Sequence, residues 1–509
     1  MTQKLLKVLL CSTLTTSILA QERPNIILFL VDDMGWQDCS LPFYEDTTMW
    51  NKIFHTPNME KLASKGMKFT SAYASAVSSP SRVSLITGTN PTKHHVTNWT
   101  LKKNATNDRA NDKLLFEQWN VNGYSPVPDI ENSYYATSLA EILKNDGYNT
   151  LFVGKAHFGA IDTPAEDPLN IGFNKNVAGH AAGAMGSYLG ERSFGNDRKD
   201  AAIWGVPNLE SYHGKDIFLT EALTLEAERL MDEALVQKKP FFLYLAHYAV
   251  HAHFEADARF YQKYIDAGLE EQEARFASIV EGMDKSLGDI MAYTEEKGIT
   301  DNTVILFMSD NGGYSVGVRA KTFGGINKNA PMRGGKGSLY QGGIREPMIV
   351  LAPGVTKPNS INSSPVMIED FFSTILDLAG VKKYECVQDL DAKSFVKALA
   401  GKEINQKRSL YWHYPNDWGE RGNECGVPSS AIIQGDMKLI HYYETGENEL
   451  FNIKEDIGEQ NNLLLRGDKY KKIARKLAKQ LSDRLREQSS PMPINKATGQ
   501  RVVYPDQTI

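Results

Sequence analysis

Past its first twenty residues, this 509-residue chain lacks any apolar run long enough to cross a membrane, and it has few cysteines. A bilayer needs roughly 20 consecutive apolar residues, so stable membrane insertion is not expected. Only Cys39, Cys386 and Cys425 lie beyond the first twenty residues. An odd number this small excludes a disulfide framework, although a single bridge between Cys386 and Cys425 is left open.

The chain also lacks a positive net charge. Its formal net charge is -6, and it contains no long run of like charges, no low-complexity tract and no internal repeat. Nucleic-acid-binding proteins present a basic field to the phosphates, so no nucleic-acid partner is predicted. The composition, 41% hydrophobic and 23% charged, is that of a globular protein, and the length favours a large domain with a smaller one.

The N-terminus has the pattern of a secretory signal. Lys4 and Lys7 precede an apolar stretch, Val8 to Ala20, that ends in a small residue before Gln21. The stretch is too short and too rich in Thr and Ser to span a bilayer well. We therefore predict that residues 1–20 are a signal peptide and that the mature protein is secreted, into a bacterial periplasm.

Several short apolar runs are each followed at once by polar side chains. They are Asn25 to Val31, Thr150 to Val153, Phe241 to Leu245 and Val304 to Met308, with helical patterns such as Ser138 to Asp146 and Asp216 to Gln237 between them. Runs of this kind suit strands buried on both faces, and the alternation predicts an α/β sandwich around a large, mostly parallel sheet. Ligands bind outside the carboxyl ends of such strands, where the polar residues fall.

Beyond Gly401 the pattern changes to short strands joined by turns. The expected strands are Ser409 to Tyr414, Ala431 to Gln434 and Met437 to Tyr443, with a hairpin at Gly435-Asp436 and a charged amphipathic helix from Lys469 to Glu487. We therefore predict a large domain over residues 21–404. Residues 405–509 are predicted to form a small α+β subdomain, an antiparallel sheet packed by one helix.

The segment Ser78-Ser79-Pro80-Ser81-Arg82 is the most informative in the chain. Pro80 and Ser81 are typical of a helix start, so Ser78 is expected just before a helix N-terminus. Unpaired N–H groups and the positive end of the helix dipole favour an anion there, and Arg82 adds a fixed cation with a bidentate donor fork. Taken alone, the segment also fits a capped surface helix with an incidental Arg.

Oxygen ligands follow two of the predicted strands. Asp32 and Asp33 come after the first strand, and Asp310 and Asn311 come after Val304 to Met308. Adjacent aspartates alone are as often a helix cap as a metal site. Four oxygen ligands at the ends of two strands favour a hard cation such as Ca²⁺.

Together these segments resemble the type I, formylglycine-dependent sulfatases of the alkaline-phosphatase superfamily, in the serine-type bacterial glycan branch. The family signature is Cys or Ser followed by x-P-S-R and later by T-G, which Ser78 to Arg82 and Thr87-Gly88 match. Other family motifs follow in family order: Asp32-Asp33, G-K-A-H at Gly154 to His157, Y-A-V-H at Tyr248 to His251, S-D-N-G at Ser309 to Gly312 and G-G-K-G at Gly334 to Gly337. The resemblance implies an alkaline-phosphatase-like sandwich, with residues 21–404 as the catalytic domain.

The resemblance also implies a role for each matching residue. Ser78 would become formylglycine and, with Asp32, Asp33, Asp310 and Asn311, bind Ca²⁺. One hydroxyl of the formylglycine hydrate would attack sulfur, and the other would lose a proton so that the bound sulfate is eliminated. The remaining roles are Arg82 on the formylglycine oxygen, Lys155 and Lys336 on sulfate oxygens, His157 assisting the elimination and His251 protonating the departing alcohol.

Several histidines have no such motif support. His247, His253 and the pair His94-His95 are predicted to be structural or solvated. His253 is also a departure, because many relatives carry Pro at that position.

Serine at position 78 implies a particular maturation route. A Cys can be oxidised by oxygen-dependent machinery, but serine lacks the thiol which that route uses. Ser-type family members depend instead on an oxygen-independent radical maturase that acts before export. That maturase is therefore the expected partner, and an anaerobic or facultative bacterium the expected source.

Secreted bacterial enzymes of this class most often act on sulfated glycans. The resemblance therefore implies an O-sulfated galactose or N-acetylgalactosamine of host mucin or glycosaminoglycan. Gly179 to Phe194 and Tyr411 to Arg421 hold aromatic and polar residues suited to a sugar, with His180 as the candidate contact. The sulfated position, exo or endo action and oligomeric state are not determined by the sequence.

Two other classes of protein compete with this interpretation. Phosphatases and phosphodiesterases of the superfamily typically bind two zinc ions and tend to carry D-H where this chain has Asp310-Asn311. Imidazole suits zinc and an amide oxygen suits calcium, which favours the sulfatase, while a phosphonate monoester hydrolase stays an alternative. The full set of polar positions disfavours a catalytically inactive sugar-binding protein.

Overall fold

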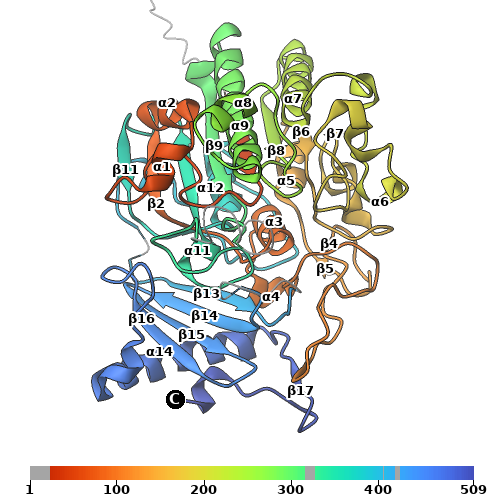
Figure 1. Cartoon of the computed structure of the whole chain (residues 1–509). Coiled ribbons are helices and arrows are strands. Elements are labelled where there is room, and N and C mark those ends of the chain that lie inside the picture. Colours follow the sequence, from red (N-terminus) through yellow and green to blue (C-terminus); the bar gives the residue numbers. More distant parts are fainter. Residues whose placement is uncertain (1–22, 316–326, 405, 419–424) are drawn as a thin grey trace, which may run out of the picture.

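The computed structural model describes residues 23–315, 327–404, 406–418 and 425–509 (Figure 1). The predicted signal peptide, residues 1–20, lies outside these ranges. Among the described residues, no helix is long and apolar enough to cross a membrane. Cys39, Cys386 and Cys425 are all free, so the bridge that the sequence left open is not formed.

A large, mostly parallel sheet forms the centre of the molecule (Figure 1). Its strands run in the order β11-β2-β10-β9-β1-β8-β6-β7, with β12 beside β2, and only the pairs that β10 makes with β9 and β2 are antiparallel. The strands in that order are β11 (Ser360–Asn362), β2 (Met67–Tyr73), β10 (Arg345–Leu351), β9 (Thr303–Ser309), β1 (Asn25–Val31), β8 (Phe241–Ala246), β6 (Asn149–Gly154), β7 (Lys175–Val177) and β12 (Val366–Met367). The predicted fold class is confirmed.

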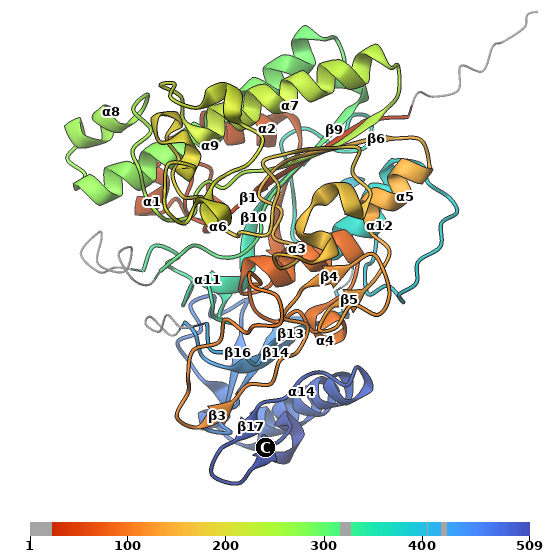
Figure 2. The same cartoon turned by 90° about the vertical axis from the view of Figure 1, so that its right-hand side faces the viewer.

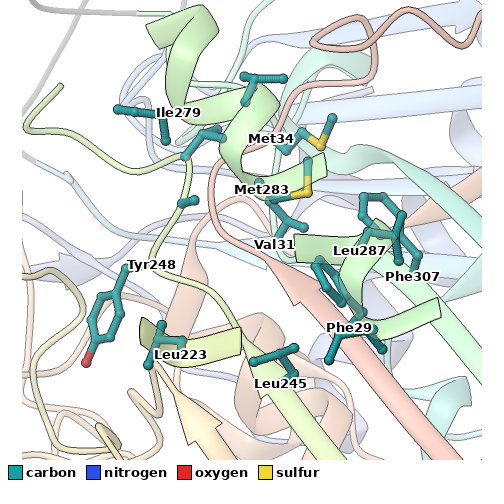
Figure 3. Packing of buried hydrophobic residues seen from close by; sticks show 14 of the residues in the cluster. Phe29, Val31, Met34, Leu223, Leu245, Tyr248, Ile279, Met283, Leu287 and Phe307 are labelled. Carbon is teal, nitrogen blue, oxygen red and sulfur yellow. The ribbon is translucent and has the colours of Figure 1, made fainter. Parts of the chain in front are cut away.

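Both faces of this sheet are covered, because alternate residues of β1 enter two different hydrophobic clusters. Phe29 belongs to one cluster and Leu28 to the other, and both are fully buried. Figure 3 shows Phe29, Leu245 and Phe307 packed against helical side chains such as Met283 and Leu287.

Helices on each side complete the three-layer sandwich (Figures 1 and 2). The first cluster includes residues of α1 (Met49–Ile53), α2 (Pro57–Lys65), α7 (Leu219–Val236), α8 (Tyr261–Asp266) and α9 (Glu271–Glu296). The second includes residues of α3 (Ser78–Thr87), α5 (Leu139–Asn145), α12 (Asp370–Leu378) and α13 (Val396–Leu399). Short elements between these are α4 (Pro91–His94), β4 (Tyr124–Ser125), β5 (Tyr134–Tyr135), α6 (Ala201–Trp204) and α11 (Gln341–Ile344).

The predicted bounds of the helices differ from the structure by a few residues. The pattern at Asp216 predicted an earlier start for α7, which begins at Leu219. Phe218 is extended and forms an isolated β-bridge with Leu189, so the helix cannot include it.

The C-terminal part has the predicted antiparallel sheet packed by one helix. The sheet order is β13 (Ser409–Tyr414), β14 (Ser429–Gln434), β15 (Met437–Tyr442) and β16 (Asn448–Asn452), and α14 (Asp468–Glu487) lies against it. The predicted hairpin joins β14 to β15, and Gly435 has a φ of 59°, which glycine adopts without steric cost.

A further small sheet joins the chain's C-terminal part to a much earlier segment. β17 (Ile494–Asn495) pairs with both β18 (Gln500–Arg501) and β3 (Leu114–Leu115). Leu114 is buried in the same cluster as Leu477 of α14. The C-terminal subdomain therefore includes a piece of the preceding region, and the boundary at residues 404 and 405 stays a prediction.

Candidate active site

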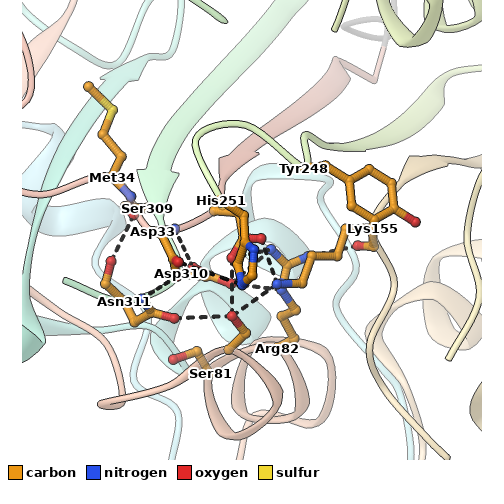
Figure 4. Close-up of polar contacts among 12 residues, drawn as sticks. Asp33, Met34, Ser81, Arg82, Lys155, Tyr248, His251, Ser309, Asp310 and Asn311 are labelled. Carbon is orange, nitrogen blue, oxygen red and sulfur yellow. Dashed lines mark hydrogen bonds and ion pairs between the residues drawn. The ribbon is translucent and has the colours of Figure 1, made fainter. Parts of the chain in front are cut away.

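The candidate residues gather where four neighbouring parallel strands end (Figure 4). Asp32 and Asp33 follow β1, and Asp310 and Asn311 follow β9. Lys155 and His157 follow β6, and His251 follows β8. Because β6, β8, β1 and β9 are adjacent and parallel, their carboxyl ends meet at one edge, which is the usual ligand site of such a sheet.

Three buried aspartates form the centre of the site. Asp32, Asp33 and Asp310 each place a carboxylate oxygen within 4.8 Å of the others, and all three are at most 1% exposed. The side-chain amide of Asn311 donates to Asp33 Oδ1 at 2.9 Å. Carboxylates that lie this close together and are shielded from solvent repel one another strongly unless cations offset their charge.

Three buried cations offset the three carboxylates. Lys155 Nζ donates to Asp32 Oδ2 at 2.6 Å, and Lys336 Nζ lies 2.6 Å from Asp33 Oδ1. Asp310 Oδ2 accepts from Arg82 Nε at 2.8 Å and lies 2.8 Å from Arg82 Nη2. The cluster is therefore balanced in formal charge, but its balance depends on every member.

The donor set fits a hard cation. Burial raises the pKa of Asp32 to about 7, and the carboxylates of Asp310 and Asp33 add to the rise against the opposing effect of Lys155. Asp33 behaves differently: burial opposes its ionisation, but the charges of Lys336, His251 and Lys155 together outweigh burial and lower the pKa of that carboxyl. A divalent ion among these oxygens would stabilise the ionised form of Asp32, and such all-oxygen sets suit Ca²⁺. No His or Cys joins this cluster among the described residues.

Ser78 lies directly against these carboxylates. Its Oγ is 3.1 Å from both Asp32 Oδ1 and Asn311 Oδ1 and accepts from Lys155 Nζ at 3.0 Å. Helix α3 begins at Ser78 itself, with Val77 as its N-cap, so the predicted position just before the helix was wrong by one residue. Ser81 is the fourth residue of the helix and does not start it, and its Oγ accepts from the N–H of Ser75.

Arg82 is fully buried and does not line the cavity described below. Besides binding Asp310, its Nη1 donates to the carbonyl of Lys155 at 2.7 Å. The guanidinium therefore fixes two strand ends relative to each other. Its predicted contact with a formylglycine oxygen stays a prediction.

His157 has one ring nitrogen bonded to the backbone and one without a partner among the described residues. Its Nε2 donates to the carbonyl of Thr100 at 2.9 Å, so Nδ1 carries no proton in the neutral ring. Nδ1 has no partner among the described residues. Burial, reinforced by the charges of Lys155 and Arg82, holds the pKa of His157 well below its ordinary value. Gly183 packs on the ring, since a Cβ there would lie 2.2 Å from His157 Cε1.

His251 presents the opposite nitrogen to the site. Its Nδ1 donates to the carbonyl of Ala252, and its Nε2 lies 3.7 Å from Asp33 Oδ2. Burial and the nearby ammonium of Lys336 lower the pKa of His251, although its 22% exposed side chain leaves water to moderate the shift. A bound anionic group would raise that pKa by offsetting Lys336.

A cavity of about 740 Å³ opens onto these groups. Six predicted site residues line it: Asp33, Ser78, Lys155, His157, His251 and Lys336. The two segments predicted to suit a sugar also contribute, through Gly183 to Gly186 and through Trp418. His180 is not part of the lining, and its ring Nε2 is enclosed without a partner among the described residues, so its predicted sugar contact stays a prediction.

The other histidines are mostly structural, as predicted. His247 Nε2 lies 2.9 Å from Ser286 Oγ, and His94 Nε2 lies 3.0 Å from Ser84 Oγ, all in buried surroundings. His253 lines the cavity and its side chain is exposed, so its assignment as structural or solvated stays a prediction. It follows His251 by two residues on the segment that forms the cavity wall.

Sequence reasoning missed several residues of the site. Trp99 lines the cavity, Thr100 fixes the tautomer of His157, and Tyr314 packs edge-on against Trp418. Trp99 and Thr100 lie in a loop with no motif, so nothing in the sequence pointed to them. Gly183 belongs to the glycine-rich stretch that was predicted to meet the sugar, but its contact with His157 had no sequence signal.

The comparison with protein families decides the class. The family model described as Sulfatase matches residues 24–381, and the model described as N-sulphoglucosamine sulphohydrolase, C-terminal, matches residues 335–488. The chain therefore belongs to the sulfatase family within the alkaline-phosphatase-like superfamily, and it is a sulfuric ester hydrolase.

Similar proteins agree with this assignment over most of the chain. A sulfatase of Formosa agariphila is 28% identical, covering 96% of this chain and 93% of its own. An N-acetylgalactosamine-6-sulfatase of Mus musculus is 27% identical, covering 89% and 84%. The crystal structure of Ps i-CgsB in complex with k-i-k-neocarrahexaose matches with a TM-score of 0.71 at 27% identity, covering 91% and 93%.

Proposed function

We propose that this sulfatase removes an O-sulfate from a galactose or N-acetylgalactosamine unit of mucin or glycosaminoglycan. The mouse relative named N-acetylgalactosamine-6-sulfatase and the similar structure in complex with k-i-k-neocarrahexaose support a sugar substrate. The cavity of about 740 Å³ lies within the range of roughly 300–1,000 Å³ typical of ligand pockets, which exceeds the need of a sulfate group alone. Trp418 and Trp99 add aromatic surface for a sugar ring.

The nucleophile is proposed to derive from Ser78, converted to formylglycine by a radical maturase. The hydrated aldehyde supplies a second hydroxyl through which the sulfated enzyme can release its product, an exit that a serine sulfate lacks. The position of Ser78 supports this role, because its Oγ lies at the cavity floor among Asp32, Asn311 and Lys155.

Asp32, Asp33, Asp310 and Asn311 would hold calcium together with the side chain at position 78. When bound, the ion polarises a sulfate oxygen and favours the deprotonated nucleophile. The residues themselves fit this assignment through their burial and their all-oxygen donor set.

The two histidines are proposed to transfer protons, and the two lysines to bind sulfate oxygens. His157 Nδ1 carries no proton and has no partner among the described residues. It can accept the proton that the second hydroxyl of the sulfated formylglycine hydrate loses as sulfate is released. His251 Nε2 faces the cavity and can deliver a proton to the departing alcohol once the anionic substrate has raised its pKa. Lys155 and Lys336 reach the cavity with buried ammonium groups that can bind sulfate oxygens.

One observation carries the proposal: Ser78 lies at the floor of the cavity against a buried cluster that offers only oxygen donors. The test is turnover by matured enzyme on sulfated, phosphorylated and phosphonylated derivatives of one sugar. Sulfate release should exceed the other two reactions by at least about 100-fold, which corresponds to roughly 3 kcal/mol of transition-state discrimination. Preferred hydrolysis of the phosphate or phosphonate ester would instead favour the phosphoesterase alternative.

We also propose that the protein is secreted after loss of residues 1–20 and acts in a bacterial periplasm. The charged start, apolar stretch and small residue before Gln21 support this. Mass spectrometry of the mature protein from fractionated cells should find Gln21 at its N-terminus. A retained N-terminus in the cytoplasmic fraction would contradict the proposal.

A further inference from the structure

Helix α14 covers the outer face of the C-terminal sheet, on the side away from the catalytic domain (Figures 1 and 2). Its apolar stripe, which includes Leu477, Leu481 and Leu485, is buried against residues of that sheet such as Leu439. The other face of the sheet packs on the catalytic domain through residues such as Trp412. The sheet therefore separates the exposed face of α14 from the catalytic domain.

The exposed face of α14 is strongly cationic. The helix carries eight Lys and Arg residues against three Asp and Glu, in a chain whose net charge is -6. Seven of these cations are exposed. Arg486 lies near the C-terminal end of the helix and pairs with Asp506, and the other six, which we call the α14 basic face, are Lys469, Lys471, Lys472, Arg475, Lys476 and Lys479.

Acidic neighbours offset little of this charge. Lys471 lies 3.4 Å from Asp468, and Lys479 lies 2.7 Å from Asp483. The remaining cations of the face have no acidic partner among the described residues, and Lys476 Nζ donates to the neutral side chain of Gln434. The face therefore keeps most of its charge for a partner outside the chain.

Helix stability does not explain this arrangement. Lys469, Lys471 and Lys472 lie in the first turns of α14, where the positive end of the helix dipole disfavours cations. Lys471 and Arg475, and likewise Lys472 and Lys476, are like-charged pairs at i and i+4, which destabilise a helix. Sequence features that oppose local stability are most often retained for function.

The cations are arranged in an extended row along the helix, not in one compact cluster. Lys469, Lys472, Lys476 and Lys479 recur at helical spacing, so they share one side of the helix over about 15 Å at 1.5 Å per residue. A line of charges suits an extended polyanion better than a single phosphate or carboxylate. We infer that the α14 basic face binds a sulfated polysaccharide chain, which holds the enzyme on the polymer whose sulfate esters it cleaves.

This inference rests on the proposed function for the identity of the polymer. Repeated sulfate groups provide the complementary charge, and the binding face is separate from the cavity. Attraction between exposed charges is screened by salt, so the contact should weaken as ionic strength rises.

The test measures binding without turnover, using the full chain with unmodified Ser78 and chondroitin sulfate as the probe. The variant Lys472→Glu/Arg475→Glu/Lys476→Glu should bind at least about tenfold more weakly at low salt, since three attractive charges become repulsive. Its thermal midpoint should stay the same or rise, because the new carboxylate at position 475 would lie at i+4 from Lys471 and at i−4 from Lys479. A purely structural role for these cations would move the midpoint down instead.

A control variant carries the same change of net charge elsewhere. Lys239→Glu/Lys382→Glu/Lys383→Glu alters three exposed lysines of the large domain and should leave the affinity within about twofold. Equal weakening by both variants would overturn the inference, because it would assign the effect to net charge alone. If the reversal variant fails to fold, Lys472→Gln/Arg475→Gln/Lys476→Gln tests the same point.

Other polyanions give the remaining outcomes. Wild-type protein should bind chondroitin sulfate more tightly than its desulfated form, duplex DNA or anionic lipid vesicles. Equal or tighter binding to DNA or vesicles would overturn the assigned partner. Sulfate release from a sulfated monosaccharide by matured enzyme tests the proposed function separately, so a failure of one proposal is distinguishable from a failure of the other.

Discussion

The protein holds two concentrations of charge that follow opposite rules. Around Ser78, three carboxylates and three cations are buried, and each charge has a partner at hydrogen-bonding distance. On the α14 basic face, the cations are exposed, and four of the six have no acidic partner among the described residues. The difference shows that solvent decides how much unbalanced charge each region can carry.

The contrast has a simple energetic origin. An ion moved out of water loses several kcal/mol of hydration unless a partner replaces it, so a buried cluster tolerates no missing member. Exposed pairs contribute about 0–1 kcal/mol, so losing a partner there matters little. Single substitutions should therefore have large effects in the first region and small effects in the second.

The largest effect is expected from the buried cluster itself. Asp310→Ala removes a proposed calcium ligand and leaves Arg82 buried without its main partner. We expect kcat/KM on a sulfated sugar to fall by at least about 1,000-fold, equivalent to roughly 4 kcal/mol. Steady-state kinetics with matured enzyme measures this loss.

Chelation provides the matched control for Asp310→Ala. Wild-type enzyme treated with a chelator should lose activity to a similar extent, and calcium should restore it better than zinc because the donors are oxygens. The variant should not respond to added calcium. Full activity in excess chelator, with no metal found by elemental analysis, would refute the metal assignment.

His251→Ala is expected to cost less and to depend on the leaving group. General acid catalysis contributes about 100- to 10,000-fold when the leaving alcohol is poor. The loss should be largest on sugar sulfates and small on activated aryl sulfates, which need no proton. Equal losses on the two substrates would contradict the assigned role.

His157→Ala should differ from His251→Ala in the step of the reaction that it slows. Attack should proceed while release slows, so a sulfated enzyme should accumulate and be visible by mass spectrometry. Accumulation in His251→Ala but not in His157→Ala would reverse the two assignments.

A buried ion pair in the C-terminal subdomain allows the effect of removing one buried charge to be measured as a change in stability. Lys438 and Glu459 are both fully buried and lie 2.6 Å apart. Lys438→Met should lower the free energy of unfolding by about 3–5 kcal/mol, because it leaves Glu459 buried without its cation. Urea unfolding measures the change, and a loss below about 1 kcal/mol would contradict the burial argument.

The free energy of unfolding of Lys438→Met should also depend on pH. Burial raises the pKa of Glu459 above its ordinary value, and removal of Lys438 should raise it further. A carboxyl group whose pKa is higher in the folded state contributes less stability as pH rises, so the destabilisation should grow as pH rises above about 4.3, the ordinary pKa of Glu.

The smallest effect is expected on the α14 basic face. Lys479 pairs with Asp483 at i and i+4, but their side chains are 70% and 42% exposed. Lys479→Ala should change the free energy of unfolding by at most about 0.5 kcal/mol. A loss comparable to that of Lys438→Met would show that exposure does not divide the two regions.

Periodicity and motifs predicted the fold and the members of the buried cluster. The strand Asn25–Val31 was identified with its exact bounds, because a run of apolar residues ending in two aspartates has few other interpretations. The neighbouring order of β6, β8, β1 and β9 was not predicted, but any parallel arrangement brings their carboxyl ends to one edge.

Long-range packing supplied what the sequence could not. The carbonyl of Thr100 selects the tautomer of His157 across 57 residues, and backbone carbonyls leave no residue-type signal. His253 was set aside for want of a motif, yet it lines the cavity because it follows His251 on the same wall segment. Gly435 was foreseen because its turn needs a positive φ, whereas Gly183 matters through a distant ring.

Ser78 is proposed to act only after conversion to formylglycine. The most direct measurement compares sulfate release by protein made with and without a serine-type radical maturase, while mass spectrometry quantifies the aldehyde in the peptide containing position 78. Activity should rise in proportion to the aldehyde content, and Ser78→Ala should be inactive in both hosts. Ser78→Cys should regain activity in a host that oxidises the Cys motif. Equal activity of the unmodified and matured proteins would contradict the account and make Ser78 an ordinary nucleophile.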